Sequence, residues 1–182
     1  MSSDRVRLAT AADLHEVARV QRSANTIYAP YGLAEHLDAL ATPPDELARG
    51  LAQGLLWVAT ESPIAHDPGP IVGFALASAF GRDLHLDEIG VEPARARRGL
   101  GSQLLEAVLA EAARRGATRL TLLTVDFVPW TLGFYARHAF RVLRAAELDA
   151  RLLELLSLDP RELAPSAQSF DGRIVLAKRL EH

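Results

Sequence analysis

One short run of the sequence combines residue types that bind anionic groups: Arg97-Arg98-Gly99-Leu100-Gly101-Ser102. The run stands directly before a segment whose apolar residues have helical spacing. Its backbone N–H groups therefore fall in the first turn of the expected helix, where they lack partners within the helix. The positive end of the helix dipole and the arginine charges favour an anion there, and glycine lets the anion approach the backbone closely. The pattern predicts a phosphate or pyrophosphate site.

Two better-known phosphate motifs do not fit this run. A Walker motif ends in Gly-Lys-Ser or Gly-Lys-Thr, and the chain contains neither. The dinucleotide fingerprint needs a third glycine at position 104, where the chain has Leu104. The residues alone leave open a helix cap with solvated arginines. A nucleic-acid-binding patch at residues 95–98 is a third interpretation, and the net charge of -3 argues against it.

Few other residues have catalytic or metal-binding chemistry. The chain has no cysteine, which excludes a disulfide, a thiolate nucleophile, a Cys-ligated zinc and an iron–sulfur cluster. His85 and Asp87 alternate along one expected strand, but two ligands do not make a metal site and no His-Glu-x-x-His run is present. We therefore expect no metal.

The composition is that of a globular protein that binds neither membranes nor nucleic acid. The chain has 182 residues, of which 49% are hydrophobic and 24% charged, and the length predicts a single domain over residues 1–182. The longest apolar runs are far shorter than the ~20 residues that span a bilayer, and the first residues lack the apolar core of a signal peptide. We expect a soluble, cytoplasmic protein.

The elements that position the anion-binding run follow from apolar periodicity. Strands are expected at residues 5–9, 55–60, 71–80, 84–91, 118–125, 140–143 and 173–180, and helices at 14–24, 45–52, 99–115, 130–137 and 147–158, with a helical turn near 35–40. The strand–helix–strand unit at 84–125 predicts two parallel neighbouring strands with a right-handed crossover. The earlier strands have short connections and should be antiparallel. The fold class is α/β (α+β), with a mixed sheet of about seven strands flanked by helices.

Two runs resemble motifs of the GNAT family of N-acetyltransferases. Val91-Glu92-Pro93, followed by Gly99-Leu100-Gly101-Ser102-Gln103-Leu104-Leu105, is similar to its acetyl-CoA motif, Arg/Gln-x-x-Gly-x-Gly/Ala. The run from Val128 to Phe140 resembles the Pro-Trp-Asn-x-x-Phe-Tyr-x-x-x-Gly-Phe pattern of one bacterial branch. The chain departs from these patterns at Ala96, Thr131 and Ala139. The order of elements also matches, so the resemblance covers nearly the whole chain.

The resemblance implies an enzyme that uses acetyl-CoA as co-substrate and no metal. Acetyl would pass to a primary amine of a small molecule or peptide, by direct attack in a ternary complex. It also implies that the parallel strand pair splays apart, and it leaves a homodimer open. The alternative is a non-catalytic acyl-CoA-binding sensor of the same fold, suggested by Ala96 and Thr131.

The same resemblance assigns roles to individual residues. Glu88 is the expected general base, directly or through water, and Tyr135 the acid that protonates the CoA thiolate. Each has a plain structural alternative: Glu88 as an ordinary carboxylate, and Tyr135 as a core residue. The expected cofactor-binding residues are Ile89, Gly90, Val91, Arg97, Arg98, Gly99, Leu100, Gly101, Ser102 and Thr131. The expected acceptor-site residues are Tyr28 and Tyr31.

Overall fold

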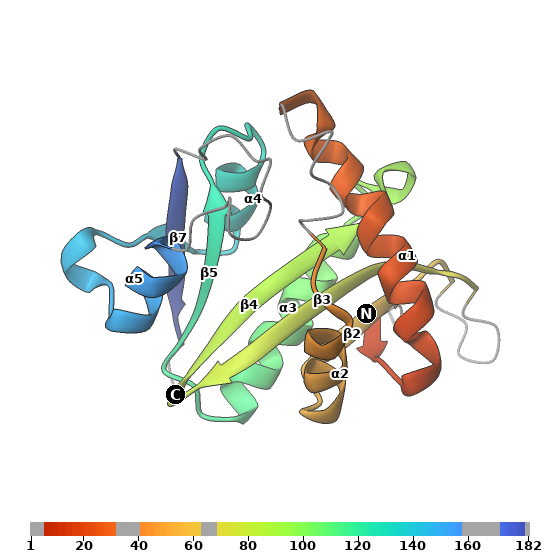
Figure 1. The fold of residues 1–182 in the computed structure, drawn as a ribbon, viewed down its shortest axis with the longest axis horizontal. Helices are drawn as coiled ribbons and strands as arrows, with labels where there is room; N and C mark the ends of the chain where they lie inside the picture. The colour runs from red at the N-terminus through yellow and green to blue at the C-terminus, as the bar shows by residue number, and fades with distance from the viewer. Residues whose placement is uncertain (1–5, 32–40, 63–68, 158–171, 181–182) are drawn as a thin grey trace. The chain divides into compact units, whose positions relative to one another are not determined.

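A computed structural model describes residues 6–31, 41–62, 69–157 and 172–180. These residues form a seven-stranded mixed sheet of order β1-β2-β3-β4-β5-β7-β6 (Figure 1). The elements are β1 (Val6–Leu8), α1 (Leu14–Asn25), α2 (Pro44–Ala52), β2 (Leu56–Thr60), β3 (Ile71–Phe80), β4 (Asp83–Val91), α3 (Leu100–Arg114), β5 (Arg119–Val125), α4 (Thr131–Arg137), β6 (Arg141–Val142), α5 (Ala150–Ser157) and β7 (Arg173–Arg179). The fold class expected from the sequence is confirmed. The helical turn expected near 35–40 lies outside the described residues.

The chain groups into two compact units, which are described separately below. The first comprises Met1–Ser78 and Leu86–Glu111, and the second Ala79–His85 and Ala112–His182. The strands β3 and β4 and the helix α3 contribute residues to both units.

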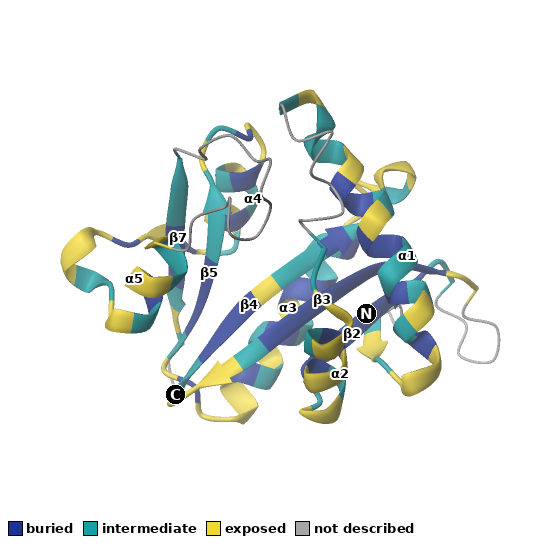
Figure 2. Cartoon of the chain, in the orientation of Figure 1, coloured by how far each residue is buried: buried dark blue, intermediate teal, exposed yellow. Residues whose placement is uncertain are grey.

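In the first unit, helices cover both faces of the antiparallel strands β1, β2 and β3. Leu56 lies opposite Leu76, and Val58 opposite Phe74, on one face of the β2–β3 pair. These side chains form a buried cluster with residues of α1 and α2, among them Val17, Val20 and Leu47. On the other face, a Cβ added at Gly73 would lie 3.2 Å from Leu104 Cδ1 of α3. Figure 2 accordingly shows β2 and most of β3 as buried.

Gly73 lies beside an irregularity in the β2–β3 pairing. Ala59 pairs with Gly73, but Thr60 pairs with Ile71, so the register shifts there by one residue. An added Cβ at Gly73 would also lie 3.1 Å from the carbonyl oxygen of Gly90. The glycine therefore lets neighbouring strands approach closely at a bulge.

In the second unit, β7 pairs antiparallel with both β5 and β6. Leu152 of α5 packs with Leu143, Val175 and Ala177, so this helix covers its own sheet. The first residues of β4 run alongside β5. Asp83 accepts a hydrogen bond from Thr118 Oγ1 at 2.6 Å, and His85 Nδ1 lies 2.8 Å from Thr121 Oγ1. Residue numbers rise together along β4 and β5, which confirms the parallel pair.

Differences from the expected elements are local. Thr26–Tyr31 forms a 3-10 helix where a loop was expected. The helix expected at 147–158 begins only at Ala150, because the carboxylate of Asp149 accepts a hydrogen bond from the Leu152 N–H at 2.9 Å and so caps the helix. No helix in the described part of the chain is long and apolar enough to cross a membrane.

Candidate functional site

The carboxylate of Glu88 lies between α1 and the segment before α2. Its Oε2 accepts hydrogen bonds from Gln21 Nε2 and from Thr42 Oγ1. Gln21 projects from α1 and is only 2% exposed, while Glu88 itself is partly buried on β4. Both donors contact the same carboxylate oxygen, so two segments of the first unit orient the group.

Burial raises the pKa of Glu88 to about 7, because desolvation disfavours the charged carboxylate. The hydrogen bonds from Thr42 and Gln21 act in the opposite direction, and the nearby charge of Asp87 adds a further raising effect. Near neutral pH, both protonation states are therefore populated. A carboxyl group with such a pKa can accept and release a proton at physiological pH.

The close approach of α1 to β4 depends on a glycine. A Cβ added at Gly90 would lie 2.8 Å from Phe74 Cε1 and 3.0 Å from Ala24 Cβ of α1, closer than normal van der Waals contact. The absence of a side chain at Gly90 therefore lets α1 lie against β4 two residues beyond Glu88. Gly90 is also one of the expected cofactor-binding residues, and these contacts give it a packing role as well.

The end of α1 and the 3-10 helix after it carry further polar groups. Burial raises the pKa of Tyr28, and the charge of Glu88 raises it further. Tyr31, the second expected acceptor-site residue, is partly buried in the same 3-10 helix. Asn25 lies one turn beyond Gln21 and is 6% exposed, and its Nδ2 has no hydrogen-bond partner among the described residues. Such a buried donor is typical of a place where water or a ligand binds.

The backbone before α3 has two residues in the left-handed region. Arg97 has φ 59° and Gly99 has φ 82°. The helix that follows adds its dipole, whose positive end favours an anion near the N-terminus. The strain at Arg97 is of the kind that persists at functional positions. A side chain at Gly99 would not clash with its neighbours, because an added Cβ would contact only Gln103 Nε2, at 3.7 Å.

The arginines before α3 differ in their surroundings. Arg95 forms an ion pair with Glu61 at 2.6 Å. Arg97 and Arg98 are exposed, and within the described ranges neither has an ion-pair partner. Two of the three cationic side chains are therefore available to a ligand.

The other expected cofactor-binding residues of the first unit lie on two elements. Leu100 is buried and anchors the start of α3, while Gly101 and Ser102 are partly buried in its first turn. Ile89 and Val91 are partly buried on β4, next to Gly90.

Tyr135 and Thr131 lie on α4 in the second unit, and both are buried. The Tyr135 ring makes edge-to-face contacts with Phe134 and Phe140, at centroid distances of 5.0 and 5.7 Å. The Thr131 N–H donates to the Val128 carbonyl at 3.1 Å. Tyr135 therefore has the core contacts of the structural alternative, which do not exclude a role for its hydroxyl group.

Ala139 adopts a left-handed conformation, with φ 62°. The related motif has glycine at this position, and glycine adopts that conformation without the steric cost of a Cβ. The chain therefore keeps the backbone turn after α4 but carries strain there.

Sequence reasoning missed two residues that contact Glu88. Gln21 occupies a position on the apolar stripe of α1, and a polar residue in that stripe was the available signal. Thr42 gave no signal, because it stands outside any periodic element. No group of three His, Asp or Glu residues that could hold a metal occurs in the part of the chain that the structure describes.

The fold is similar to that of solved acetyltransferases. The PaiA N-acetyltransferase from Thermoplasma acidophilum, solved with coenzyme A, is 14% identical with a TM-score of 0.71, over 96% of this chain and 98% of that chain. N-acetylglutamate synthase from Neisseria gonorrhoeae, solved with coenzyme A and N-acetyl-glutamate, is 19% identical with a TM-score of 0.67. That match covers 97% of this chain and 35% of that chain. A GNAT-family acetyltransferase from Staphylococcus aureus is 15% identical with a TM-score of 0.63, over 97% of this chain and 98% of that chain.

Sequence comparison agrees with the likeness in fold. Residues 28–140 match the sequence profile of the acetyltransferase (GNAT) family. This range runs from Tyr28 to Phe140, so it includes the Glu88 strand, the start of α3 and the whole of α4. Because the match extends over more than half of the chain, the protein belongs to the GNAT family of acetyltransferases.

Proposed function

We propose that the protein is an acetyl-CoA-dependent N-acetyltransferase that acts on a primary amine of a small molecule or peptide. The observation that carries the proposal is the position of Glu88 in this GNAT-family chain, between α1 and the segment before α2, where Gln21 and Thr42 hold its carboxylate. Burial there raises its pKa to about 7. Attack by an amine requires a base that is deprotonated at working pH and still basic enough to remove a proton. Acetyl-CoA supplies the acetyl group as an activated thioester, and the amine attacks it directly in a ternary complex.

In this proposal Glu88 takes the proton of the acceptor amine, directly or through a water molecule. Gln21 and Thr42 hold the Oε2 atom of Glu88 and so restrict the orientation of the carboxylate. Restricting a base in this way lowers the entropy cost of reaching the reactive geometry. Tyr28, whose pKa responds to the charge of Glu88, contributes to the acceptor site together with Tyr31.

The start of α3 is the proposed site for the pyrophosphate of the co-substrate. The left-handed residues Arg97 and Gly99, the exposed Arg98 side chain and the N-terminus of α3 fit such a dianionic group. By the family resemblance, the backbone of residues 89–91 binds the pantetheine arm and Thr131 contributes to the cofactor site. The hydroxyl of Tyr135 is the proposed acid that protonates the departing thiolate.

The role of Glu88 predicts a specific pH dependence. With a pKa of about 7, the deprotonated fraction rises about tenfold between pH 6 and pH 8, and kcat/KM should rise with it. Thr42→Val removes a hydrogen bond that lowers the pKa, so the midpoint of its profile should move to higher pH by up to about one unit. The same acceptor amine is used for both proteins, so its own ionisation cancels. An unchanged midpoint in Thr42→Val and a retained acid limb in Glu88→Gln would remove Glu88 from the mechanism.

Binding of the co-substrate is tested by titration calorimetry with acetyl-CoA, using NADH and ATP as controls. Only acetyl-CoA should bind. Gly99→Ala should weaken binding, because alanine disfavours the left-handed φ of 82°. Gly116→Ala is the matched control: its φ is 68°, it lies beyond the opposite end of α3, and an added Cβ there meets nothing within 4 Å.

Turnover separates the two candidate activities. A screen of amines for acetyl-dependent thiol release should find an acceptor. Tight acetyl-CoA binding with no release across the screen would favour the non-catalytic acyl-CoA sensor instead. No binding of acetyl-CoA would overturn both.

A further inference from the structure

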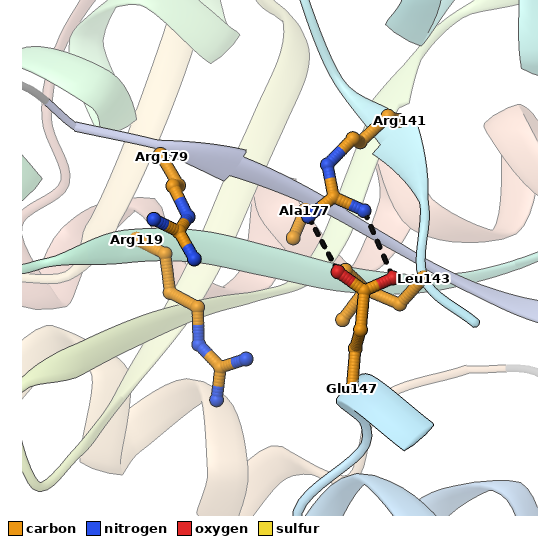
Figure 3. A pocket seen from close by; sticks show the side chains of 6 residues that line it. All are labelled: Arg119, Arg141, Leu143, Glu147, Ala177 and Arg179. Atoms are coloured by element: carbon orange, nitrogen blue, oxygen red, sulfur yellow. Dashed lines mark hydrogen bonds and ion pairs between the residues drawn. The ribbon is translucent and has the colours of Figure 1, made fainter. Parts of the chain in front are cut away.

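A small cavity in the second unit is lined by three arginines, none of which belongs to the candidate site described above. Figure 3 shows its lining: Arg119 of β5, Arg141 of β6, Arg179 of β7, with Leu143, Glu147 and Ala177. Its volume is about 220 Å³. A guanidinium group presents several N–H donors in one plane, which suits it to phosphate and carboxylate groups.

Strand register brings the three arginines together. Arg119 pairs directly with Arg179 across the β5–β7 ladder, and Arg141 pairs with Ala177 across the β6–β7 ladder. Ala177 and Arg179 are two residues apart on β7, so their side chains share one face of the sheet. In Figure 3 the guanidinium groups of Arg141 and Arg179 accordingly flank Ala177.

Two of the arginines are held by carboxylates. Arg119 Nε lies 2.6 Å from Asp83 Oδ2, and its Nη2 lies 2.5 Å from Asp149 Oδ2. Arg141 binds both carboxylate oxygens of Glu147, at 2.7 and 3.1 Å. These contacts fix the two guanidinium groups and still leave N–H donors unused on each.

Arg179 differs from the other two. Its guanidinium group has no ion pair or hydrogen bond with any described residue, although it stands directly opposite Arg119. Like charges that face each other across a ladder destabilise a sheet unless a counter-charge is present. The pairing therefore leaves Arg179, a cationic side chain without an ion-pair partner among the described residues, beside a cavity that Glu147 also lines.

We propose that this cavity binds a tetrahedral phosphate group, as free inorganic phosphate or as the phosphate end of a small monoester. The volume lies below the range of about 300–1,000 Å³ that is typical of sites for larger organic ligands. A dianion would supply the counter-charge for Arg179 and accept from the unused donors of Arg119 and Arg141. The site is independent of the proposed acetyl transfer.

The test is titration calorimetry with inorganic phosphate at constant ionic strength, set with sodium chloride. Arg179→Gln should weaken phosphate binding about tenfold or more, since it removes the unpaired fork of charged donors. Lys178→Gln removes the same charge from the adjacent residue, whose side chain points to the other face, and should change the affinity less than twofold. Arg179→Lys keeps the positive charge but loses the planar set of guanidinium N–H donors, so its phosphate affinity should lie between those of Arg179→Gln and Lys178→Gln.

The design separates this cavity from the start of α3, because none of the three variants alters that site. Tighter binding of glycerol 3-phosphate than of inorganic phosphate would identify the monoester as the natural form, and equal or weaker binding would identify free phosphate. Circular dichroism spectra and melting temperatures of unliganded Arg179→Gln should match or exceed those of the parent protein. Equal phosphate affinity in Arg179→Gln and the parent, equal loss in Lys178→Gln, or no phosphate binding would each overturn the proposal.

Discussion

Replacing Glu88 by glutamine should change how the stability of the protein depends on pH. Glutamine has nearly the same shape, and its side-chain oxygen can still accept the hydrogen bonds from Gln21 and Thr42. The substitution therefore removes the ionisation of Glu88 while keeping its contacts. Because stability is measured without substrate, this prediction does not depend on the identity of the acceptor.

The expected magnitude follows from the pKa of Glu88, which is about 7 in the folded protein against an ordinary value of 4.5. A folded-state pKa above the unfolded one means that the contribution to stability is fully present below about pH 4.5. It is then lost as pH rises through about 7. At 1.36 kcal/mol for each pH unit, the loss approaches about 3 kcal/mol above pH 8. Glu88→Gln should not show this loss.

The assay is urea unfolding of the parent protein and Glu88→Gln at pH 5 and pH 8. Other groups with shifted pKa values, such as the buried His85, are common to both proteins and cancel in the difference. Relative to the parent, Glu88→Gln should gain about 2.5 kcal/mol of unfolding free energy on going from pH 5 to pH 8, because part of the loss has already occurred at pH 5. Glu106→Gln removes a carboxylate from an exposed position on α3 and should follow the parent at both pH values.

The prediction is wrong if the unfolding free energies of the parent and Glu88→Gln differ by the same amount at pH 5 and pH 8. That result would mean that Glu88 ionises in the folded protein as it does in the unfolded chain. The carboxylate would then be solvated, and its assignment as a base poised near neutral pH would lose its physical basis.

Three further substitutions test the packing and chemistry around the two motifs. Gly90→Ala should lower the unfolding free energy by about 1–3 kcal/mol, because its Cβ would meet Phe74 Cε1 at 2.8 Å; unchanged urea unfolding would contradict the close approach of α1. Ala139→Gly should raise the unfolding free energy by up to about 1 kcal/mol, because glycine relieves the strain of the left-handed φ. As a control, Ala136→Gly in the helix α4 should lower the unfolding free energy by about 1 kcal/mol. If both substitutions lower it, Ala139 is not strained. Tyr135→Phe should reduce turnover by about 100-fold or more and leave the acetyl-CoA affinity nearly unchanged, and equal turnover would exclude the hydroxyl as the acid.

Much of the fold was predictable because its signals are local. Apolar periodicity placed the seven strands and the long helix after Gly99, and the strand–helix–strand spacing predicted the parallel β4–β5 pair. The glycines and arginines before α3 predicted an anion site through the chemistry of a helix N-terminus. These signals need only neighbouring residues, since backbone geometry repeats along the chain.

The environment of Glu88 was not predictable, because it is built by residues distant in sequence. Gln21 and Thr42 stand 67 and 46 residues before Glu88, and no pattern of neighbouring residues records that they meet. The pKa of Glu88 depends on how much water the surrounding elements exclude, which is a property of packing. The same holds for the pairing of Arg95 with Glu61 and for the cavity beside Arg179. Local sequence specifies which chemical groups each element presents, and the packing of distant elements sets their protonation, their partners and their access to a ligand.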